Sequence, residues 1–582
     1  MIYTSHFEAV TSQEQYTGGV FEFLFGRGNP AYDADRTAII DAITGQKVRS
    51  LVFVFFLWPG KLTPRSRQTS YGLLVEESLR FADGLTRVAG LHRGQTILIF
   101  SPNSALYPIL VFAAQAAGLV VSTANSSYTA TELAHQITLS SADLVLAGAD
   151  LVLTAKEAIK KADLKESALF VLPDVNGKMP QHLNSFRSYQ SLRGEKSFKP
   201  VSFTKEQAQN QLAYLPFSSG TTGQAKGVQL SAFNITSCTQ QARKTKGLFD
   251  EPDTMLAVLP MYHICAFLLS CSSLGLVVVL HLTLYNGGTV VVLPKFDLAQ
   301  TLDVIQRFKT TAACVVPPLA LALAKQPIVD NYDLSSLRFI VSGAAPLSAD
   351  LQQAVAKRLK GKTLVFQGYG MTETTSIGLI PDTQKELVPG TAGQLLSSME
   401  ARLVDADGKD VKVGEAGELW LRGNNIMLGY HRNEKSTRET LTGDGWLMTG
   451  DVCERDHDGY YRIVERTKDL IKYKGFQVAP AEVEGVILSS PAVADCAVIG
   501  VWSEEQATEL PRAYIVPDPK HAKSETLCKD VANWVADKLA PHKRLRGGVI
   551  VLETIPKSAS GKILRKDLRV MAAQEAESKA RL

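Results

Sequence analysis

Strand-like and helix-like segments alternate through most of the chain, and this alternation constrains its fold more than any other feature. The first clear run predicts strands at Thr96–Phe100, Val120–Thr123 and Asp143–Ala147, with helices at Ser104–Ala117 and Thr129–Leu139 between them. The second helix begins with a capping box, Thr129-x-x-Glu132. Strands that alternate with helices form parallel sheets covered by helices. The sequence therefore predicts an α/β protein.

The same order returns farther along the chain. Leu337–Ser342 and Thr363–Gln367 are apolar and strand-like, and a helix is predicted at Ala349–Leu359 between them. A glycine-bearing loop follows each strand, Gly343–Pro346 after the first and Gly368–Gly370 after the second. Ligands bind to parallel sheets at the carboxyl ends of the strands, so these two loops are candidates for a binding site.

The pattern changes after about Gly393. Short strands with glycine turns are predicted at Ala401–Val404, Glu418–Arg422 and Tyr460–Val464, and compact α+β patterns follow Asp469. We therefore expect a large N-terminal domain, residues 1–466, of parallel-sheet βα layers with a small β-barrel-like part. A small α+β C-terminal domain, residues 467–582, is expected to follow it.

Composition excludes several classes of protein. Of the 582 residues, 45% are hydrophobic and 21% charged, as in ordinary globular proteins and unlike disordered or coiled-coil chains. The 62 basic and 58 acidic residues leave a net charge of only +4, which argues against a nucleic-acid-binding protein. The seven cysteines are scattered, with no C-x-x-C pair, which favours a reducing compartment and disfavours a disulfide scaffold or a zinc site.

Two apolar stretches raise the question of a membrane span. Leu51–Trp58 has eight residues, too few to cross a bilayer, which takes about 20. Ala266–Tyr285 reaches 20 residues without a formal charge, so its length alone makes it a candidate. We favour the alternative that it is a buried helix running into a buried strand, and we expect no transmembrane span.

The strongest local signal is the segment Ser218–Gly227 (SSGTTGQAKG), which follows the apolar run Leu212–Phe217. Glycines allow backbone N–H groups to approach an anion, hydroxyls donate hydrogen bonds, and Lys226 adds a positive charge. This chemistry suits a phosphate, although the spacing is not that of a Walker A loop. A flexible surface loop is the alternative on composition alone.

Seven further motifs follow in a fixed order. They are Leu259–His263 (LPMYH), Ser342–Pro346 (SGAAP), Gln367–Glu373 (QGYGMTE), Gly417–Gly423 (GELWLRG) with Thr449–Asp451 (TGD), Arg466–Gln477 (RTKDLIKYKGFQ) and Pro556–Lys562 (PKSASGK). Together with the segment Ser218–Gly227, called the phosphate loop below, they resemble the adenylate-forming superfamily over nearly the whole chain. Ile471–Glu484 and Ile555–Leu568 are most similar to 4-coumarate–CoA ligases and related acyl-CoA ligases.

The resemblance implies an ATP-dependent acid–thiol ligase. A carboxylic acid reacts with ATP to give acyl-AMP and pyrophosphate, and coenzyme A then displaces AMP. By this resemblance the phosphate loop holds the β- and γ-phosphates, Thr372 the α-phosphate, Glu373 a magnesium ion, and Asp451 with Arg466 the ribose. The other implied nucleotide-binding residues are Ser218, Ser219, Gly220, Thr221, Thr222, Gly223, Lys226, Gly343, Ala344, Ala345, Gln367, Gly368, Tyr369 and Gln477.

The resemblance also divides the two reactions between two lysines. Lys562 corresponds to the adenylation lysine, which bridges the carboxylate and the α-phosphate, and Lys468 to the hinge about which the mobile C-terminal domain rotates. Lys472 and Gly475 would then face the site for thioester formation. His263 corresponds to a histidine beside the acyl chain; a buried structural histidine is the alternative. The basic cluster Lys543–Arg546 could bind the phosphates of coenzyme A, and a solvated face is the alternative for it.

The chain departs from coumarate ligases at its expected acyl pocket, where Cys265 stands for tyrosine and Ser376-Ile377 for proline-valine. Two segments are also longer than in the family, Ser50–Thr69 and part of Leu274–Tyr285. The acid therefore stays open among fatty, aryl and polyketide-like acids. An adenylation enzyme that loads a carrier protein is a second hypothesis, disfavoured because no Asp-Ser-Leu segment follows Lys562, and a catalytically degraded relative is a third.

The last three residues, Ala580-Arg581-Leu582, resemble the small–basic–leucine signal that a peroxisomal import receptor recognises. We expect a peroxisomal protein, and otherwise a cytoplasmic one. A chance match of three residues is the alternative.

Overall fold

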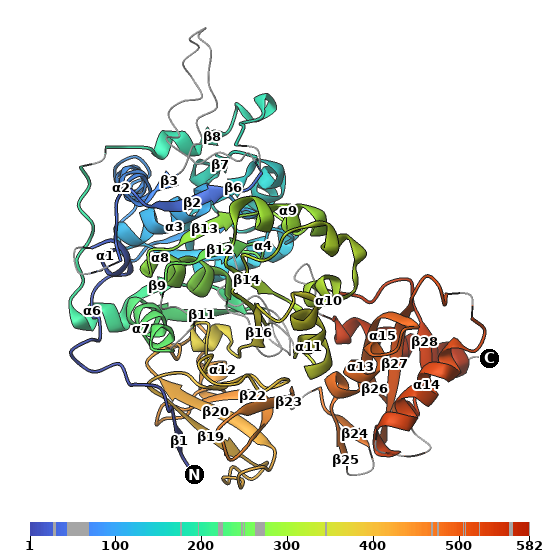
Figure 1. Cartoon of the computed structure of the whole chain (residues 1–582). Helices are drawn as coiled ribbons and strands as arrows, with labels where there is room; N and C mark the ends of the chain where they lie inside the picture. The colour runs from blue at the N-terminus through green and yellow to red at the C-terminus, as the bar shows by residue number, and fades with distance from the viewer. Residues whose placement is uncertain are drawn as a thin grey trace.

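The computed structural model describes most of the chain (Figure 1). The described residues are 1–26, 29, 31–43, 69–174, 177–195, 197–218, 225–245, 248, 251–261, 274–343, 346–466, 469–473, 476–503, 506, 508–522, 524–539, 541–557 and 563–580. The apolar octet Leu51–Trp58 lies outside them.

The strands predicted between Thr96 and Ala147 lie side by side in the larger of two parallel-stranded sheets. In it, β4 pairs in parallel with β5 on one side and with β6 on the other. The strand order is β10-β11-β9-β5-β4-β6-β7-β8, with β21 also paired to β11. The strands are β4 (Thr96–Phe100), β5 (Val120–Ala124), β6 (Ala142–Gly148), β7 (Leu169–Leu172), β8 (Arg187–Ser188), β9 (Leu212–Tyr214), β10 (Phe217–Ser218), β11 (Lys226–Ser231) and β21 (Gly429–Tyr430).

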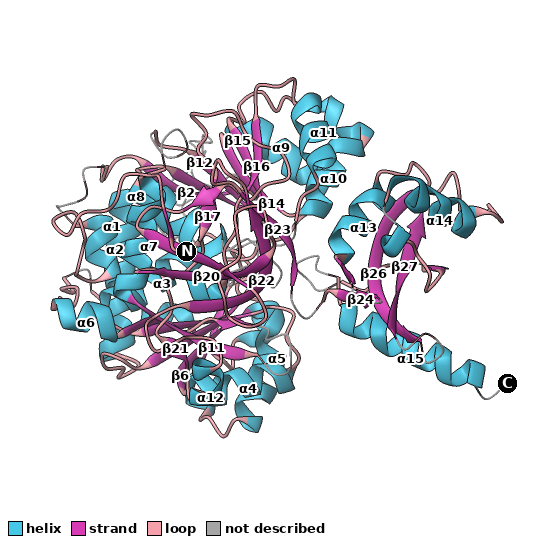
Figure 2. Cartoon of the chain, turned by 90° about the horizontal axis from the view of Figure 1, so that it is seen from below, coloured by secondary structure: helices cyan, strands magenta, loops and turns pink. Residues whose placement is uncertain are grey.

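Strand β4 is buried on both faces, because helices cover the sheet from both sides (Figure 2). Ile97 and Ile99 pack into one hydrophobic core, and Leu98 and Phe100 into another, as the two-residue period of a strand requires. Helices α2 (Tyr71–Arg87) and α3 (Leu106–Ala116) contribute to the first core, and α4 (Ala130–Ser140) and α5 (Val152–Lys161) to the second. The predicted capping box of α4 is confirmed, with Thr129 and Glu132 bonded reciprocally.

The second sheet has seven strands in the order β16-β15-β14-β12-β13-β2-β3, and all its pairs are parallel except β2–β3. Its strands are β2 (Thr37–Asp41), β3 (Thr69–Ser70), β12 (Thr254–Ala257), β13 (Thr289–Val292), β14 (Ala312–Val315), β15 (Phe339–Ser342) and β16 (Leu364–Gln367). Other helices of this part of the chain are α1 (Val20–Phe25), α6 (Lys205–Asn210), α7 (Ala232–Arg243), α9 (Leu298–Phe308), α10 (Pro317–Lys325) and α11 (Ala349–Arg358).

The apolar stretch Ala266–Tyr285 is helical wherever it is described. A π-helix, Leu274–Leu282, continues into the short α8, Thr283–Tyr285, and both pack into the main core. The prediction of a strand within this stretch was wrong, because the chain stays helical to Tyr285 and strand β13 begins only at Thr289. Of the helices in the described residues, none combines the length and apolar character that a membrane span needs.

A five-stranded antiparallel sheet follows, in the order β1-β19-β20-β22-β23, as the change of pattern after Gly393 predicts. Its strands are β1 (Tyr3–Thr4), β19 (Met399–Val404), β20 (Gly417–Gly423), β22 (Leu447–Arg455) and β23 (Tyr461–Arg466). The hairpin β17 (Leu379–Ile380)–β18 (Gln394–Leu395) and helix α12 (Glu434–Arg438) complete this part. The predicted fold class is thereby confirmed for the large N-terminal part.

The last part of the chain is a small α+β unit with cores of its own (Figure 1). Glu465 on β23 accepts a hydrogen bond from the backbone N–H of Ala481 in this unit. Its elements are the hairpin β24 (Ile471–Tyr473)–β25 (Phe476–Val478), the sheet β26 (Val493–Ser503), β27 (Thr508–Pro517) and β28 (Val549–Val551), and helices α13 (Pro480–Leu488), α14 (Leu527–Lys538) and α15 (Arg565–Ala580).

Candidate functional site

The two predicted glycine loops leave neighbouring parallel strands at the same edge of the seven-stranded sheet. Ser342 at the end of β15 lies opposite Gln367 at the end of β16. The backbone N–H of Gly368 then donates to the carbonyl of Ser342 at 3.3 Å. The carboxyl ends of these strands are where a ligand is expected in such a sheet.

Tyr369, in the second loop, reaches Asp451 on β22. Its hydroxyl donates to Oδ2 of Asp451 at 2.6 Å, and both residues are buried. Asp451 lies directly opposite Arg466 in the pairing of β22 with β23. The structure therefore brings Tyr369, which is expected to bind the nucleotide, together with the expected ribose acid and the backbone of Arg466, although their sequence positions are far apart.

Glu373, the expected magnesium ligand, is buried and held by two hydroxyl groups. The Tyr430 hydroxyl donates to its Oε1 at 2.8 Å, and the Ser218 hydroxyl donates to the same atom at 3.2 Å. Its backbone carbonyl accepts from the N–H of Met427 at 2.8 Å. Both hydroxyl groups therefore bind the same carboxylate oxygen.

The phosphate loop begins and ends beside this carboxylate. Ser218 on β10 pairs with Lys226 on β11, so the two ends of the loop are opposite one another. The Lys226 ammonium lies 4.9 Å from the centroid of the Tyr430 ring. Residues 219–224, and with them Ser219, Gly220, Thr221, Thr222 and Gly223, lie outside the described residues, as do Ala344 and Ala345 of the first glycine loop.

The Gly368–Glu373 loop has a fold that its sequence demands. A Cβ on Gly370 would lie 1.9 Å from the carbonyl oxygen of Ser376, so only glycine fits there. Asn425 holds the segment directly after this loop, because its Nδ2 donates to the carbonyls of Thr374 and Ile377 at 3.0 and 2.8 Å. Thr372 begins a buried 3₁₀ turn, Thr372–Thr374, directly before Glu373 in that loop.

Gln367, expected among the nucleotide-binding residues, makes its described contacts with the protein backbone. Its Oε1 accepts from the N–H of Leu347 at 2.9 Å, and its Nε2 donates to the carbonyl of the same residue at 3.0 Å. These two bonds fix the turn that follows Gly343. Gln367 thus shapes the first glycine loop from the end of the next strand.

Tyr430 contacts an expected site residue and Asn103 holds one of the expected motifs, and the sequence analysis missed both. Asn103 holds the Leu259–Met261 segment, because its Nδ2 donates to the Leu259 carbonyl at 2.9 Å and its Oδ1 accepts from the Met261 N–H at 2.6 Å. This segment leads to His263, which lies outside the described residues. Neither residue carries a local signal beyond its polar or aromatic side chain, Asn103 in the loop after β4 and Tyr430 at the end of β21.

The C-terminal unit supplies the remaining expected residues, of which the structure describes only a part. Lys472 pairs with Gln477 across the hairpin β24–β25. Lys557 pairs with Ile563 in an isolated bridge, and the Leu564 N–H donates to the Pro556 carbonyl at 2.8 Å. These contacts close the base of the loop that carries Lys562. Lys562 itself, Lys468 and Gly475 lie outside the described residues.

The basic cluster Lys543–Arg546 is partly occupied by neighbours within the unit. Lys543 binds the Glu482 carboxylate at 2.5 and 2.6 Å. The Arg546 guanidinium lies 4.8 Å from the centroid of the Tyr473 ring, next to Lys472 in the hairpin. Arg544 is exposed. The cluster therefore presents less positive charge than its sequence suggests.

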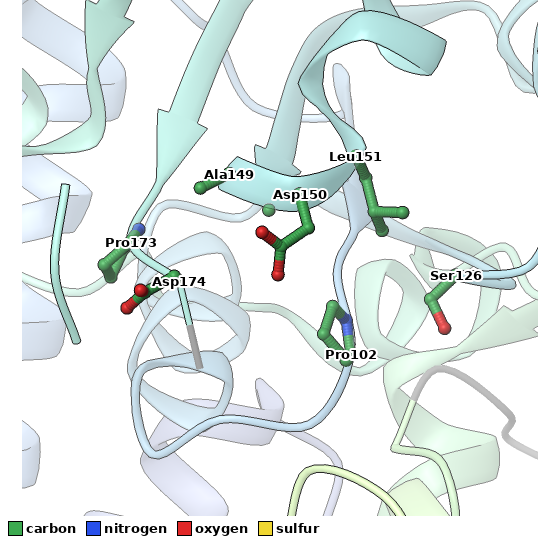
Figure 3. A pocket seen from close by; sticks show the side chains of 8 residues that line it. Pro102, Ser126, Ala149, Asp150, Leu151, Pro173 and Asp174 are labelled. Atoms are coloured by element: carbon green, nitrogen blue, oxygen red, sulfur yellow. The ribbon is translucent and has the colours of Figure 1, made fainter. Parts of the chain in front are cut away.

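A separate cavity of about 130 Å³ opens at the carboxyl ends of strands in the larger sheet (Figure 3). Loops after β4, β5, β6 and β7 contribute to it, and two of its residues are acidic, Asp150 and Asp174. Carboxylates repel the phosphates of a nucleotide. This cavity is therefore less suited to ATP than the Tyr369–Asp451 and Glu373–Lys226 region.

Comparisons with known proteins agree with this geometry. Residues 35–431 match the profile of the AMP-binding enzymes, and residues 482–562 match that of their C-terminal domain. The chain is 37% identical to "Probable 4-coumarate–CoA ligase 1" of Dictyostelium discoideum over 501 residues, which are 84% of this chain and 88% of the relative. It is 36% identical to "Peroxisomal OPC-8:0-CoA ligase 1" of Arabidopsis thaliana, over 93% of this chain and 92% of the relative.

Solved structures give the same result. The fold superposes on the anthranilate CoA ligase AuaEII in complex with anthranoyl-AMP with a TM-score of 0.82 and 25% identity, over 96% of this chain and 98% of the other. It superposes on ATP-bound MatB from Rhodopseudomonas palustris with a TM-score of 0.78 and 28% identity, over 95% and 98% of the two chains. Extended similarity of sequence and of fold thus points to the same class of enzyme.

Proposed function

We propose that the chain, which belongs to the AMP-binding enzyme family and is an acid–thiol ligase, is an ATP-dependent acyl- or aryl-CoA ligase. The carboxylate attacks the α-phosphate of ATP and releases pyrophosphate, giving acyl-AMP. The thiol of coenzyme A then attacks the acyl carbon and releases AMP. The observation that carries the proposal is the convergence of Glu373, Ser218, Lys226 and Tyr430 from four segments of the sequence.

In this proposal the nucleotide lies along the carboxyl edge of the seven-stranded sheet. The phosphate loop binds the β- and γ-phosphates, with Lys226 as its cation, and Thr372 contacts the α-phosphate. The adenine lies against Tyr369, beside the Gly343–Ala345 loop. Asp451 accepts the ribose hydroxyls, and the Tyr369 hydroxyl fixes the orientation of that carboxylate. Fixed donors of this kind stabilise the charge that develops in transfer reactions at phosphorus.

The residues beside the phosphate loop fit a magnesium ion. Mg²⁺ prefers oxygen ligands, and it usually takes one or two carboxylates, substrate phosphates and water rather than a complete protein cage. Glu373 offers one buried carboxylate, and both of its hydroxyl donors bind the same oxygen, Oε1. Within the described residues, no group of three or more His, Cys, Asp or Glu side chains gathers to hold a metal. The ion would screen the repulsion between the triphosphate and the incoming carboxylate.

The second part of the proposal concerns the C-terminal domain, residues 467–582. Lys562 serves adenylation, and Lys472 with Gly475 serves thioester formation. Rotation of the domain at Lys468 brings first one lysine and then the other to the same site. The residues on either side of Lys562 are held together, since Lys557 pairs with Ile563 and the Leu564 N–H donates to the Pro556 carbonyl. Gln477, opposite Lys472 in the hairpin, enters the site with it.

The acid remains a class rather than a compound. The relatives and solved neighbours are named for 4-coumarate, OPC-8:0, anthranilate and benzoate, so these acids, with other aryl acids and fatty acids, are the first to test. We further propose that the protein is peroxisomal and is recognised by the import receptor through Ala580-Arg581-Leu582. The name of the Arabidopsis relative supports this, and Arg581 and Leu582 lie outside the described residues.

Pyrophosphate release measured with a panel of aryl and fatty acids tests the proposal. We expect release that depends on both ATP and one class of acid, followed by a CoA thioester detectable by mass spectrometry. Release without a thioester would favour the carrier-loading enzyme. Folded protein that releases no pyrophosphate with any acid would favour the degraded relative and overturn the proposal.

A further inference from the structure

Tyr430 contacts two groups that the proposed function uses, although it is itself neither a metal ligand nor a cation. Its hydroxyl donates to Glu373 Oε1 at 2.8 Å, and its ring lies 4.9 Å from the Lys226 ammonium. The residue is buried at the end of the two-residue strand β21. The same side chain therefore contacts the proposed metal carboxylate at one end and the phosphate-loop lysine on its face.

The position of Tyr430 is fixed by its neighbours. Its backbone pairs with Val228 in β11, two residues after Lys226, and its N–H donates to the Thr437 hydroxyl at 2.9 Å. Gly429 before it has a φ of 143°, and a Cβ there would lie 2.8 Å from Thr437. The tyrosine is thus held from both sides in a register that the phosphate-loop strand sets.

Tyr430 contacts two groups of opposite charge, the ammonium with its ring and the carboxylate with its hydroxyl. A lysine ammonium beside a buried carboxylate would form an ion pair, and neither group would then be available to a phosphate or a cation. In the described residues no ion pair joins Lys226 to Glu373, and the ammonium instead lies over an aromatic face. A cation–π contact holds the ammonium weakly, so the charge stays available to an incoming phosphate.

We propose that Tyr430 is a positioning residue that orients Glu373 for the magnesium ion and keeps Lys226 from pairing with it. The hydroxyl holds Oε1, so that Oε2 faces the cation, and the ring holds the lysine beside the phosphates. This inference rests on the proposed function for the identity of the ion and of the phosphates. Residues that orient a metal ligand typically change metal affinity by about 10- to 100-fold when they are removed.

Two variants separate the roles of the hydroxyl and the ring. Tyr430→Phe removes only the hydroxyl, and Tyr430→Leu removes the ring as well. Tyr71→Phe is the matched control, because Tyr71 is also a buried tyrosine and its hydroxyl donates to the backbone carbonyls of Leu284 and Gly288, away from Glu373. A purely structural role for Tyr430 would lower the melting temperature as Tyr71→Phe does, without changing metal affinity.

Binding of Mn²⁺, measured by electron paramagnetic resonance with a non-hydrolysable ATP analogue present, is the first measurement. We expect Tyr430→Phe to weaken Mn²⁺ binding roughly 10-fold and Tyr71→Phe to leave it unchanged. Tyr430→Leu is expected also to weaken binding of the analogue at saturating Mn²⁺, because Lys226 can then pair with Glu373. Wild-type Mn²⁺ affinity in Tyr430→Phe would overturn the inference.

The second measurement separates this inference from the proposed function. Pyrophosphate exchange is followed against Mg²⁺ concentration in the wild type and in Tyr430→Phe. Absence of exchange in the wild type would contradict the proposed function, while the Mn²⁺ comparison would still decide the role of Tyr430. An unchanged half-saturating Mg²⁺ concentration in Tyr430→Phe, with active wild type, would contradict the positioning role.

Discussion

The hydroxyl of Tyr369 donates a hydrogen bond of 2.6 Å to Oδ2 of Asp451, and each residue is 1% exposed. The two residues are 82 positions apart, with Tyr369 in the loop after β16 and Asp451 on β22. Their contact joins the loop after β16 to strand β22, and thus joins the proposed adenine slot to the proposed ribose acid. It fixes the part of the site that would recognise the nucleoside.

Removing this hydroxyl is expected to weaken the binding of ATP. A hydrogen bond to a charged group contributes about 1.5–3 kcal/mol, so Tyr369→Phe should raise the KM for ATP by about 10-fold or more. The measurement is the initial rate of pyrophosphate exchange against ATP concentration. Tyr71→Phe serves as the control, and an unchanged KM in Tyr369→Phe would show that the bond does not position the nucleoside.

Glu465 makes a contact that rotation of the C-terminal domain would break. Its carboxylate accepts from the N–H of Ala481, the second residue of α13, at 3.1 Å, where the helix dipole favours a negative charge. Glu465→Gln should therefore destabilise this orientation of the domain by about 1 kcal/mol. We expect pyrophosphate exchange and thioester formation from supplied acyl-AMP to change in opposite directions. Equal changes in both rates would argue against a role of Glu465 in the choice between orientations.

The buried His281 predicts a pH dependence of stability. It lies in the π-helix, with Tyr214 OH 2.8 Å from Nε2 and the Leu276 carbonyl 2.8 Å from Nδ1. Burial lowers its pKa to about 4, below the ordinary value of 6.5. Between pH 6.5 and 4 the unfolded chain therefore binds a proton at this histidine that the folded chain does not bind. The free energy of unfolding is fully retained above pH 6.5 and falls as the pH is lowered from 6.5 to 4.

His281→Leu removes this dependence together with both hydrogen bonds. At pH 8 the variant should melt below the wild type, because the Tyr214 hydroxyl loses its partner. Between pH 6.5 and 5 the free energy of unfolding of the wild type should fall by ~2 kcal/mol more than that of the variant. The difference in melting temperature between wild type and variant should therefore become smaller. Calorimetry at the three pH values tests this, and a constant difference would show that His281 does not titrate on unfolding.

Local patterns were sufficient to predict much of the fold. The strand Thr96–Phe100 was recognisable as an apolar run, because all five of its residues are buried between two helix layers. The capping box of α4 was recognisable from the spacing of Thr129 and Glu132, which are bonded to one another. Within Leu274–Tyr285 a strand was predicted where the structure has a helix, since a fully buried helix and a fully buried strand are equally apolar.

The site was predictable where a motif lies within one loop, and less so where a contact joins distant segments. Ser218, Lys226 and Glu373 carry chemistry in recognisable strings, and the structure brings them together. Tyr430 and Asn103 act through neighbours far away in the sequence, on Glu373 and on the backbone of Leu259–Met261. Only the folded chain shows these contacts, because no spacing within the sequence encodes them.

The most direct test of the account is to measure the two half-reactions separately in Lys562→Ala and Lys472→Ala. Lys562→Ala should reduce pyrophosphate exchange by roughly 10²–10³-fold and largely spare thioester formation from supplied acyl-AMP, and Lys472→Ala should do the reverse. Equal loss of both half-reactions in both variants would contradict the division of the chemistry between two orientations of one mobile domain.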